Sequence, residues 1–120
     1  MKKIFTIASV MILTVVLLAS CTKRDYIYDE DYWLTRERGV VVYSDSYCPY
    51  YVVETRNGYT IIRSQVGITP FEGSVIYGDL SRLGSMDLYN YSDGTIIMGN
   101  VRDYWLSYYD AQNSVDYLCY

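Results

Sequence analysis

The chain has 120 residues, with 10 basic and 14 acidic side chains and a net charge of −4 at pH 7. It contains no histidine, which excludes Ser-His-Asp and Cys-His nucleophile systems and histidine metal sites. An acidic chain repels a phosphate backbone, and no basic cluster offsets that repulsion, so we expect no nucleic-acid partner. The 16 tyrosines favour strands and half-buried surfaces, because each has a large apolar ring and a polar tip.

The N-terminus combines a basic start, an apolar run and a cysteine that follows small residues. Lys2 and Lys3 precede the apolar segment "IFTIASVMILTVVLLA" (4–19), an order typical of a secretory signal. The segment is shorter than the roughly 20 apolar residues that a membrane-spanning helix needs. The four residues "LASC" (18–21) resemble the lipobox of bacterial lipoproteins at every position.

This resemblance covers the first 21 residues and implies a cleaved signal peptide over residues 1–20. It also implies that Cys21 carries a thioether diacylglycerol, usually with an N-acyl chain such as palmitate. Two or more acyl chains hold a protein stably at a membrane, whereas one chain holds it only marginally. The alternatives are an ordinary cleaved signal with a chance cysteine, or an uncleaved anchor. In Gram-negative lipoproteins a residue other than aspartate after the cysteine, here Thr22, implies the outer membrane of the cell envelope.

Removal of residues 1–20 leaves a chain of about 100 residues, which is enough for one domain with a modest core. The 8 basic and 14 acidic residues that remain give the mature chain a charge near −6. We expect residues 21–38 to be the lipidated cysteine and a charged tether, and residues 39–120 to form a single β-rich domain with a C-terminal helix. The acidic run 29–31 lacks the glycine turn of a calcium loop, so we interpret it as a solvated part of the tether.

Short β-branched and aromatic runs bounded by turn residues predict the strands of this domain. Asn57-Gly58 predicts a two-residue type I′ hairpin, because both of its central positions need positive φ. In that register Val53 faces Ile62, and Tyr51 shares their face, which we assign to the core. The strands are expected at 39–43, 50–55, 59–64, 74–78, 88–92 and 95–99.

Asp93-Gly94 predicts a second hairpin of the same kind, in which Tyr89 faces Met98 and Tyr91 faces Ile96. Alternation at period two in these runs supports a sheet with one covered side.

The C-terminal segment changes its period from two to between three and four. Apolar residues at this spacing predict a helix, with Asn100 as its N-cap and Trp105 facing the core. The residues of the stripe are Val101, Trp105, Tyr108, Ala111, Val115 and Leu118. The tyrosines of the segment favour a strand instead, and that alternative stays open.

Together these elements predict an α+β, mainly β fold: a small antiparallel sheet or SH3-like barrel of about five strands with a C-terminal helix. The segment "FEGSVIYGDL" (71–80) resembles the middle of an SH3-like barrel, and the likeness is local.

Cys48 and Cys119 are the cysteines that remain after the signal and Cys21. Beyond the inner membrane the compartment is oxidising, so we expect them to form a disulfide. That bond would close a loop of about 70 residues and stabilise the fold by roughly 4 kcal/mol in the chain-entropy model. The alternative is two buried free thiols. The absence of a CxxC pair argues against a thioredoxin-like redox role.

Exposed aromatic side chains are the best candidates for a binding surface, because tyrosine and tryptophan stack on sugars and pack against peptides. The loop "SDSYCPYY" (44–51) contains a proline and the disulfide cysteine, so we expect it to be rigid. The alternative is that the tyrosines only cover a thin core. The proposed patch consists of Tyr47, Tyr50, Tyr51, Tyr108 and Tyr109.

Catalytic and cofactor motifs are not found in the sequence. No GxxxxGK[ST] or GxGxxG phosphate loop occurs, and we assign no catalytic, cofactor-binding or metal-binding residue. Glu54 and Glu72 are the only glutamates after residue 38 and could form the carboxylate pair of a glycoside hydrolase. Glu54 is expected next to Arg56 and diagonal to Arg63, so an ordinary surface ion pair explains it.

We therefore expect a lipid-anchored envelope protein with a structural or binding role toward a glycan or a protein partner, and not an enzyme. The alternative is an accessory subunit of an envelope complex, and a carboxylate-dependent hydrolase ranks third.

Overall fold

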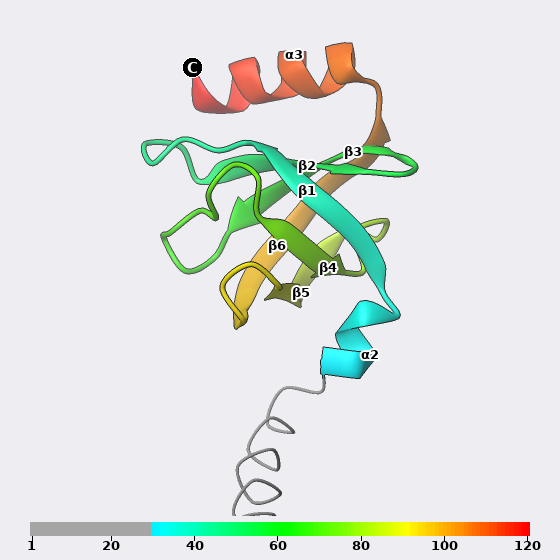
Figure 1. The fold of residues 1–120 in the computed structure, drawn as a ribbon. Helices are drawn as coiled ribbons and strands as arrows, with labels where there is room; N and C mark the ends of the chain where they lie inside the picture. Colours follow the sequence, from blue (N-terminus) through cyan, green and yellow to red (C-terminus); the bar gives the residue numbers. More distant parts are fainter. Residues whose placement is uncertain (1–29) are drawn as a thin grey trace, which may run out of the picture. The chain divides into compact units, whose positions relative to one another are not determined.

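Six antiparallel strands close into a barrel, and a C-terminal helix packs against the outer face of two of them (Figure 1). The structure is a computed structural model that describes residues 30–120, so the predicted signal peptide and Cys21 lie outside the described residues. The elements are α2 (Glu30–Leu34), β1 (Glu37–Tyr43), β2 (Tyr50–Thr55), β3 (Gly58–Ser64), β4 (Val75–Gly78), β5 (Gly84–Asn90), β6 (Thr95–Leu106) and α3 (Tyr108–Cys119).

The strand order around the barrel is β1-β2-β3-β6-β5-β4, and β4 closes the circle by pairing with β1. Because β4 returns to the side of β1 after three consecutive strands, the connection is a Greek key. Closure pairs both edges of the sheet, which removes the exposed strand edges that promote aggregation. The expected mainly β fold with a C-terminal helix is confirmed. The barrel has six strands where about five were expected, and each overlaps one of the six strand ranges named from the sequence.

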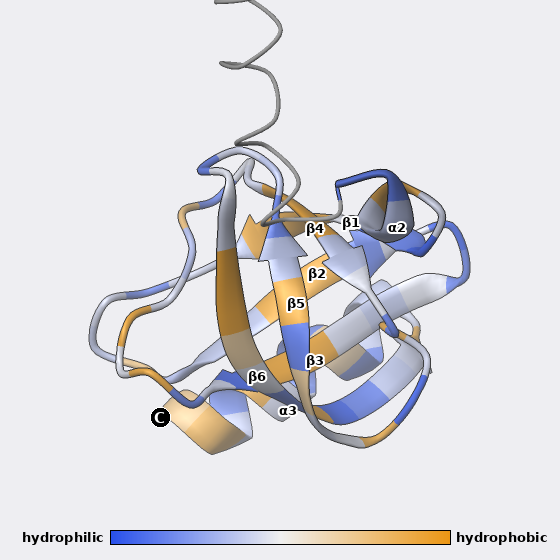
Figure 2. Cartoon of the chain, turned by 90° about the horizontal axis from the view of Figure 1, so that it is seen from below, coloured by the Kyte–Doolittle hydropathy of each residue, from blue (hydrophilic) through white to orange (hydrophobic). Residues whose placement is uncertain are grey.

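The barrel interior is filled by apolar side chains from all six strands and the loop after β4. Figure 2 shows hydrophobic stretches along β2, β3 and β5. Tyr51, Val53 and Ile62 all belong to this cluster, so the prediction that they share the core face is confirmed. The buried members are Val41, Tyr51, Val53, Ile62, Ile76, Leu80, Leu88 and Val101.

The register of the first hairpin differs from the prediction by two residues. Thr55 pairs with Gly58, so the two turn residues are Arg56 and Asn57. The Thr55 hydroxyl accepts from the Asn57 N–H at 3.1 Å and donates to the Gly58 carbonyl at 3.0 Å, which closes the turn one residue earlier. Gly58 has φ +131°, and a Cβ there would lie 2.8 Å from the Leu106 carbonyl oxygen, so its glycine is needed for close approach to β6.

The second hairpin is also shifted by two residues from its predicted register. Asn90 pairs with Thr95, which leaves a four-residue loop over 91–94. The buried Asn90 closes this loop, because its carbonyl accepts from the Gly94 N–H at 2.8 Å and its side-chain oxygen accepts from the Asp93 N–H at 3.3 Å. Consequently Tyr89 faces Ile96 rather than Met98.

The C-terminal helix begins seven residues later than the stripe predicted, because residues 101–106 continue strand β6. Asn100, the predicted N-cap, lies in this strand opposite Arg63 and Ser85. The N-cap is Ser107, whose hydroxyl accepts from the Asp110 N–H at 3.1 Å. Pairing with β3 continues through residues 101–106 and outweighs the helical spacing of their apolar side chains.

Trp105 is exposed over 60% of its surface, so the prediction that it faces the core is wrong. It has φ +59°, the one positive value at a non-glycine position within residues 30–120. This conformation turns the chain at the end of β6. The indole N–H donates to the Ser81 hydroxyl at 2.7 Å, and Ser81 donates to the Glu37 carboxylate at 2.7 Å. The network fixes the tryptophan against the loop after β4.

Helix α2 falls within the segment predicted to be the tether. Trp33 of α2 stacks on Tyr89 of β5, with ring centroids 6.2 Å apart. Within residues 30–120, no helix has both the length and the apolar character needed to cross a membrane.

Candidate functional site: the α3 cleft

Helix α3 covers the outer face of β2 and β3. Ala111 and Val115, one turn apart on the helix, pack on Val52 and Ile61 of the strands, and these four residues form a second buried cluster. Outward-facing strand positions are apolar here, because they are covered by the helix rather than by water. Partly buried residues around the cluster are Tyr43, Tyr50, Tyr59, Leu106, Leu118 and Cys119.

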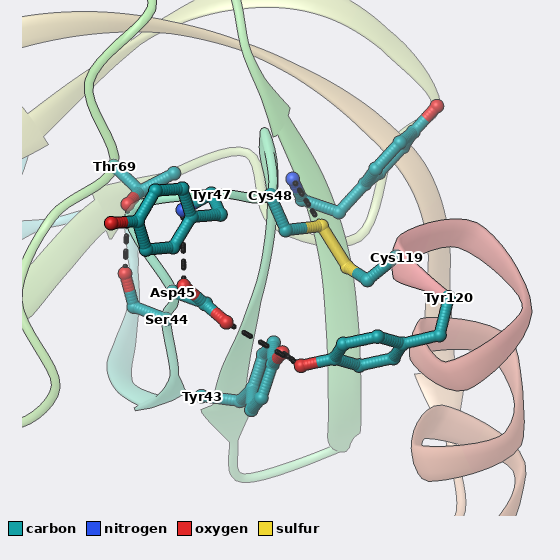
Figure 3. The surroundings of a disulfide bond; sticks show 9 residues. Tyr43, Ser44, Asp45, Tyr47, Cys48, Thr69, Cys119 and Tyr120 are labelled. Atoms are coloured by element: carbon teal, nitrogen blue, oxygen red, sulfur yellow. Dashed lines mark hydrogen bonds between the residues drawn. A yellow bond between two sulfur atoms is a disulfide. The ribbon is translucent and has the colours of Figure 1, made fainter.

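A disulfide attaches the C-terminal end of α3 to the loop between β1 and β2. Cys48 and Cys119 are bonded, with Cα atoms 5.5 Å apart and a sequence separation of 71, so the predicted pairing is confirmed. Figure 3 shows the side chains of Tyr43 and Tyr120 close together near the bond. The hydroxyl groups of Tyr43 and Tyr120 lie 3.1 Å apart, and the Tyr120 hydroxyl donates to the Asp45 carboxylate at 3.4 Å. The helix end is therefore held by one covalent bond and a small hydrogen-bond network.

The environment of Tyr43 raises the pKa of its hydroxyl from 10.0 to about 12. The main cause is the hydrogen bond with Tyr120, followed by partial burial. Nearby negative charge on Asp45 and Asp116 adds to the shift, because it disfavours a phenolate.

A cleft of about 370 Å³ opens between α3 and strands β1, β2 and β3. We call it the α3 cleft. Its floor and walls are mainly apolar and aromatic, and such a lining is typical of small-ligand and side-chain pockets of about 300–1,000 Å³. The lining residues are Val42, Tyr43, Val52, Glu54, Tyr59, Tyr108, Ala111, Gln112, Val115 and Asp116.

Two of the cleft tyrosines contact each other across the boundary between sheet and helix. The rings of Tyr59 on β3 and Tyr108 on α3 meet edge to face, with centroids 5.8 Å apart. Partial desolvation raises the pKa of Tyr59, and the nearby Glu54 carboxylate and Tyr108 act in the same direction. A hydrogen bond between the side chains of Tyr59 and Glu54 adds to the shift, because it stabilises the protonated phenol.

The structure does not bring the five predicted patch residues together. Tyr108 lines the α3 cleft. Tyr47 is 95% exposed but belongs to the loop after β1, and Tyr109 is exposed on α3 without lining the cleft. Tyr51 is only 1% exposed, so its inclusion in a surface patch is wrong. In β2 its side chain points inward, because Tyr50 and Val52 on either side take the outward positions under α3.

Tyr50 is half-buried beneath two cations. The guanidinium carbon atoms of Arg63 and Arg102 lie 5.9 Å and 5.7 Å from its ring centroid. The two arginine side chains therefore lie against the Tyr50 ring, which was predicted to stack on a ligand.

The sequence did not indicate that Tyr43, Glu54 and Tyr59 would line the same cleft. The outward parity of Glu54 and Tyr59, which pair across β2 and β3, was available from the hairpin pattern. Their meeting with α3 was not, because it depends on where the helix docks.

The predicted carboxylate pair is separated in the structure. Glu54 lines the α3 cleft, whereas Glu72 lies in the loop after β3 and accepts from the Ser44 N–H at 3.3 Å. Glu54 forms no ion pair with Arg56 or Arg63. Within residues 30–120, no cluster of three or more His, Cys, Asp or Glu side chains is placed to hold a metal ion.

Comparison of the chain with protein-family models, curated proteins and solved structures gave no match in any of the three.

Proposed function

We propose that this protein is a bacterial envelope lipoprotein that acts as a non-enzymatic binding module, with the α3 cleft as its ligand site. The observation that carries the proposal is the cleft itself: about 370 Å³ of apolar and tyrosine-lined space next to solvent. An open apolar surface costs free energy in water, and its occupation by a ligand recovers that cost.

The walls of the α3 cleft are held on both sides, which favours selective binding. Strands β2 and β3 form one wall, and the buried contacts of Ala111 and Val115 hold the helix that forms the other. The disulfide at Cys119 prevents the helix end from separating from the barrel. The helix and the strands that carry the lining residues are therefore held in place before a ligand binds, which lowers the entropy cost of binding.

The lipid on Cys21 would hold the domain at the outer membrane, through the segment that precedes β1. A Cys21→Ala variant should lose incorporation of an alkyne-labelled fatty acid and leave the membrane fraction. A variant that stays wholly in the membrane fraction would contradict the lipid assignment.

The binding site can be tested in living cells with a photo-cross-linking amino acid at Gln112, which lines the cleft, and at Asp87, an exposed control on β5. We expect a discrete adduct from position 112 only. Protease treatment identifies a protein partner, and glycosidase treatment identifies a glycan. Equal labelling from both positions, or none from either, would overturn the α3 cleft as the ligand site.

A second candidate function, an accessory subunit of an envelope complex, is favoured by a different surface. Val66, Ile68 and Phe71 in the loop after β3 are exposed, as is Tyr47 in the loop after β1. A hydrogen bond of 2.9 Å between the hydroxyls of Ser44 and Thr69 joins the two loops. Exposed apolar side chains grouped in this way are typical of protein interfaces.

A cross-linker at position 71 tests this second candidate in the same cells. A single stoichiometric adduct from position 71, together with none from position 112, would favour the subunit over the binding module.

A further inference from the structure

The lining of the α3 cleft carries negative charge and no basic side chain. Glu54 enters it from β2 and Asp116 from α3, and the other lining residues are uncharged. Neither carboxylate forms an ion pair with any residue of the described part of the chain. Two acidic groups beside apolar walls produce a local negative potential that an incoming cation would neutralise.

Aromatic rings in the same cleft suit an organic cation better than a metal ion or a neutral group. Tyr43, Tyr59 and Tyr108 line it, and the face of a tyrosine ring attracts an ammonium or guanidinium group. Val52 and Val115 offer apolar contact for an alkyl stem. The raised pKa values of Tyr43 and Tyr59 agree with negative surroundings, since each is shifted partly by a nearby carboxylate.

The apolar surface extends beyond the cleft, which points to a ligand longer than one side chain. Val42 lies at the edge of the cleft and is 40% exposed on the outer face of β1. Tyr108 is also exposed at the start of α3. Residues that flank the cation could therefore make apolar contacts on both sides of it. A basic segment would in addition be drawn toward a chain with a net charge of −4.

We infer that the α3 cleft binds a lysine or arginine side chain presented by a peptide segment of a partner protein, with its charged head at Glu54 and Asp116 and its stem on Val52 and Val115. The inference rests on the proposed function, because it names the ligand of that same site.

The test is a titration of the isotope-labelled full chain in non-ionic detergent, followed by the methyl resonances of Ala111 and Val115. The probes are acetyl-Leu-Lys-Leu-amide and the two peptides with Gln or Glu in place of Lys. We expect saturable shifts with the lysine peptide and an affinity at least about tenfold lower for the glutamine peptide, as removal of a favourable ionic and cation–π contact predicts. A higher salt concentration should lower the affinity of the lysine peptide and leave that of the glutamine peptide unchanged.

Substitutions that keep side-chain shape separate charge from packing. The Glu54→Gln/Asp116→Asn variant should reduce the preference for lysine over glutamine to less than about threefold. Asp87→Asn removes one charge from an exposed site on β5 outside the cleft and should leave the preference unchanged. Unperturbed spectra of the free variants show that they are folded.

Two outcomes overturn different parts of the inference. Equal affinity of the lysine and glutamine peptides for the α3 cleft would disprove the preference for a cation. The cleft would still be a binding site in that case. The absence of saturable shifts with all three peptides would remove the peptide ligand, and the adduct from position 112 would then decide whether the proposed function stands.

Discussion

Replacement of Tyr51 by phenylalanine should stabilise the protein, although it removes a polar group. The Tyr51 hydroxyl is buried and has no hydrogen-bond partner among residues 30–120. It packs close to β6, since a Cβ added to Gly99 would lie 3.4 Å from the hydroxyl oxygen. Burial also raises the pKa of Tyr51, because it disfavours the phenolate.

The size of the effect follows from two opposing terms. A buried hydroxyl without a partner costs about 1–3 kcal/mol, while loss of one packed oxygen atom sacrifices a fraction of that in dispersion contacts. We expect Tyr51→Phe to raise the free energy of unfolding by about 1 kcal/mol. For a domain of this size that corresponds to a rise of about 4–8 °C in Tm.

The assay is urea and thermal unfolding, followed by near-ultraviolet circular dichroism with the disulfide intact. Tyr117→Phe is the matched control, because Tyr117 is 85% exposed and its variant should stay within about 0.5 kcal/mol of the parent. If Tyr51→Phe unfolds at a lower urea concentration than the parent while the control does not, the hydroxyl is hydrogen-bonded in the folded protein and the reasoning is refuted.

Three further predictions concern the disulfide, a turn glycine and a phenol. Cys48→Ala/Cys119→Ala should lower the free energy of unfolding by about 4 kcal/mol in the chain-entropy model, and a loss below about 1 kcal/mol in urea unfolding would show that the bond does not constrain the unfolded chain. Gly58→Ala should lower the free energy of unfolding by about 1–3 kcal/mol through backbone strain, and further through the clash with β6. Gly94→Ala should lower it less, because a Cβ at Gly94 meets nothing within 4 Å. Equal losses of unfolding free energy in the two variants would contradict the close approach of Gly58 to β6. The environment of Tyr43 raises its pKa from 10.0 to about 12, so the protonated hydroxyl stabilises the fold fully below pH 10 and this contribution is lost as the pH rises through about 12. If the ultraviolet titration of the tyrosines in this range is the same in Tyr43→Phe as in the parent, the shift is disproved.

The hairpins show why a pattern can predict the core and still miss the register. Side chains alternate at period two, so a shift of two residues leaves every side chain on its original face. Tyr51, Val53 and Ile62 were therefore assigned to the core correctly, even though Val53 faces Thr60 instead of Ile62. The shift itself comes from the Thr55 hydroxyl and from the contact of Gly58 with β6, and the second contact involves a strand almost fifty residues away.

The boundary between β6 and α3 shows where local spacing loses to tertiary contacts. Val101 and Trp105 fit a helical stripe, yet Val101 lies in the barrel core and Trp105 is exposed at the turn into α3. Residues four apart share a face in a regular strand as well as in a helix, so this spacing cannot distinguish the two. The register shifts between β3 and β6 and the positive φ of Trp105 interrupt the alternation before Trp105, and the register shifts exist only when both strands are in place.

The sequence by itself determined the β-rich class, the core face of the first hairpin and the pairing of Cys48 with Cys119. Each of these depends on residue type and on short-range periodicity, or on a choice between very few cysteines. The expectation of a lipid on Cys21 also depends on the sequence alone. Only the tertiary structure decided the closed barrel, the inward turn of Tyr51 and the α3 cleft. The cleft joins residues from Val42 to Asp116, and no local pattern can show which outward faces meet until the helix docks on the barrel.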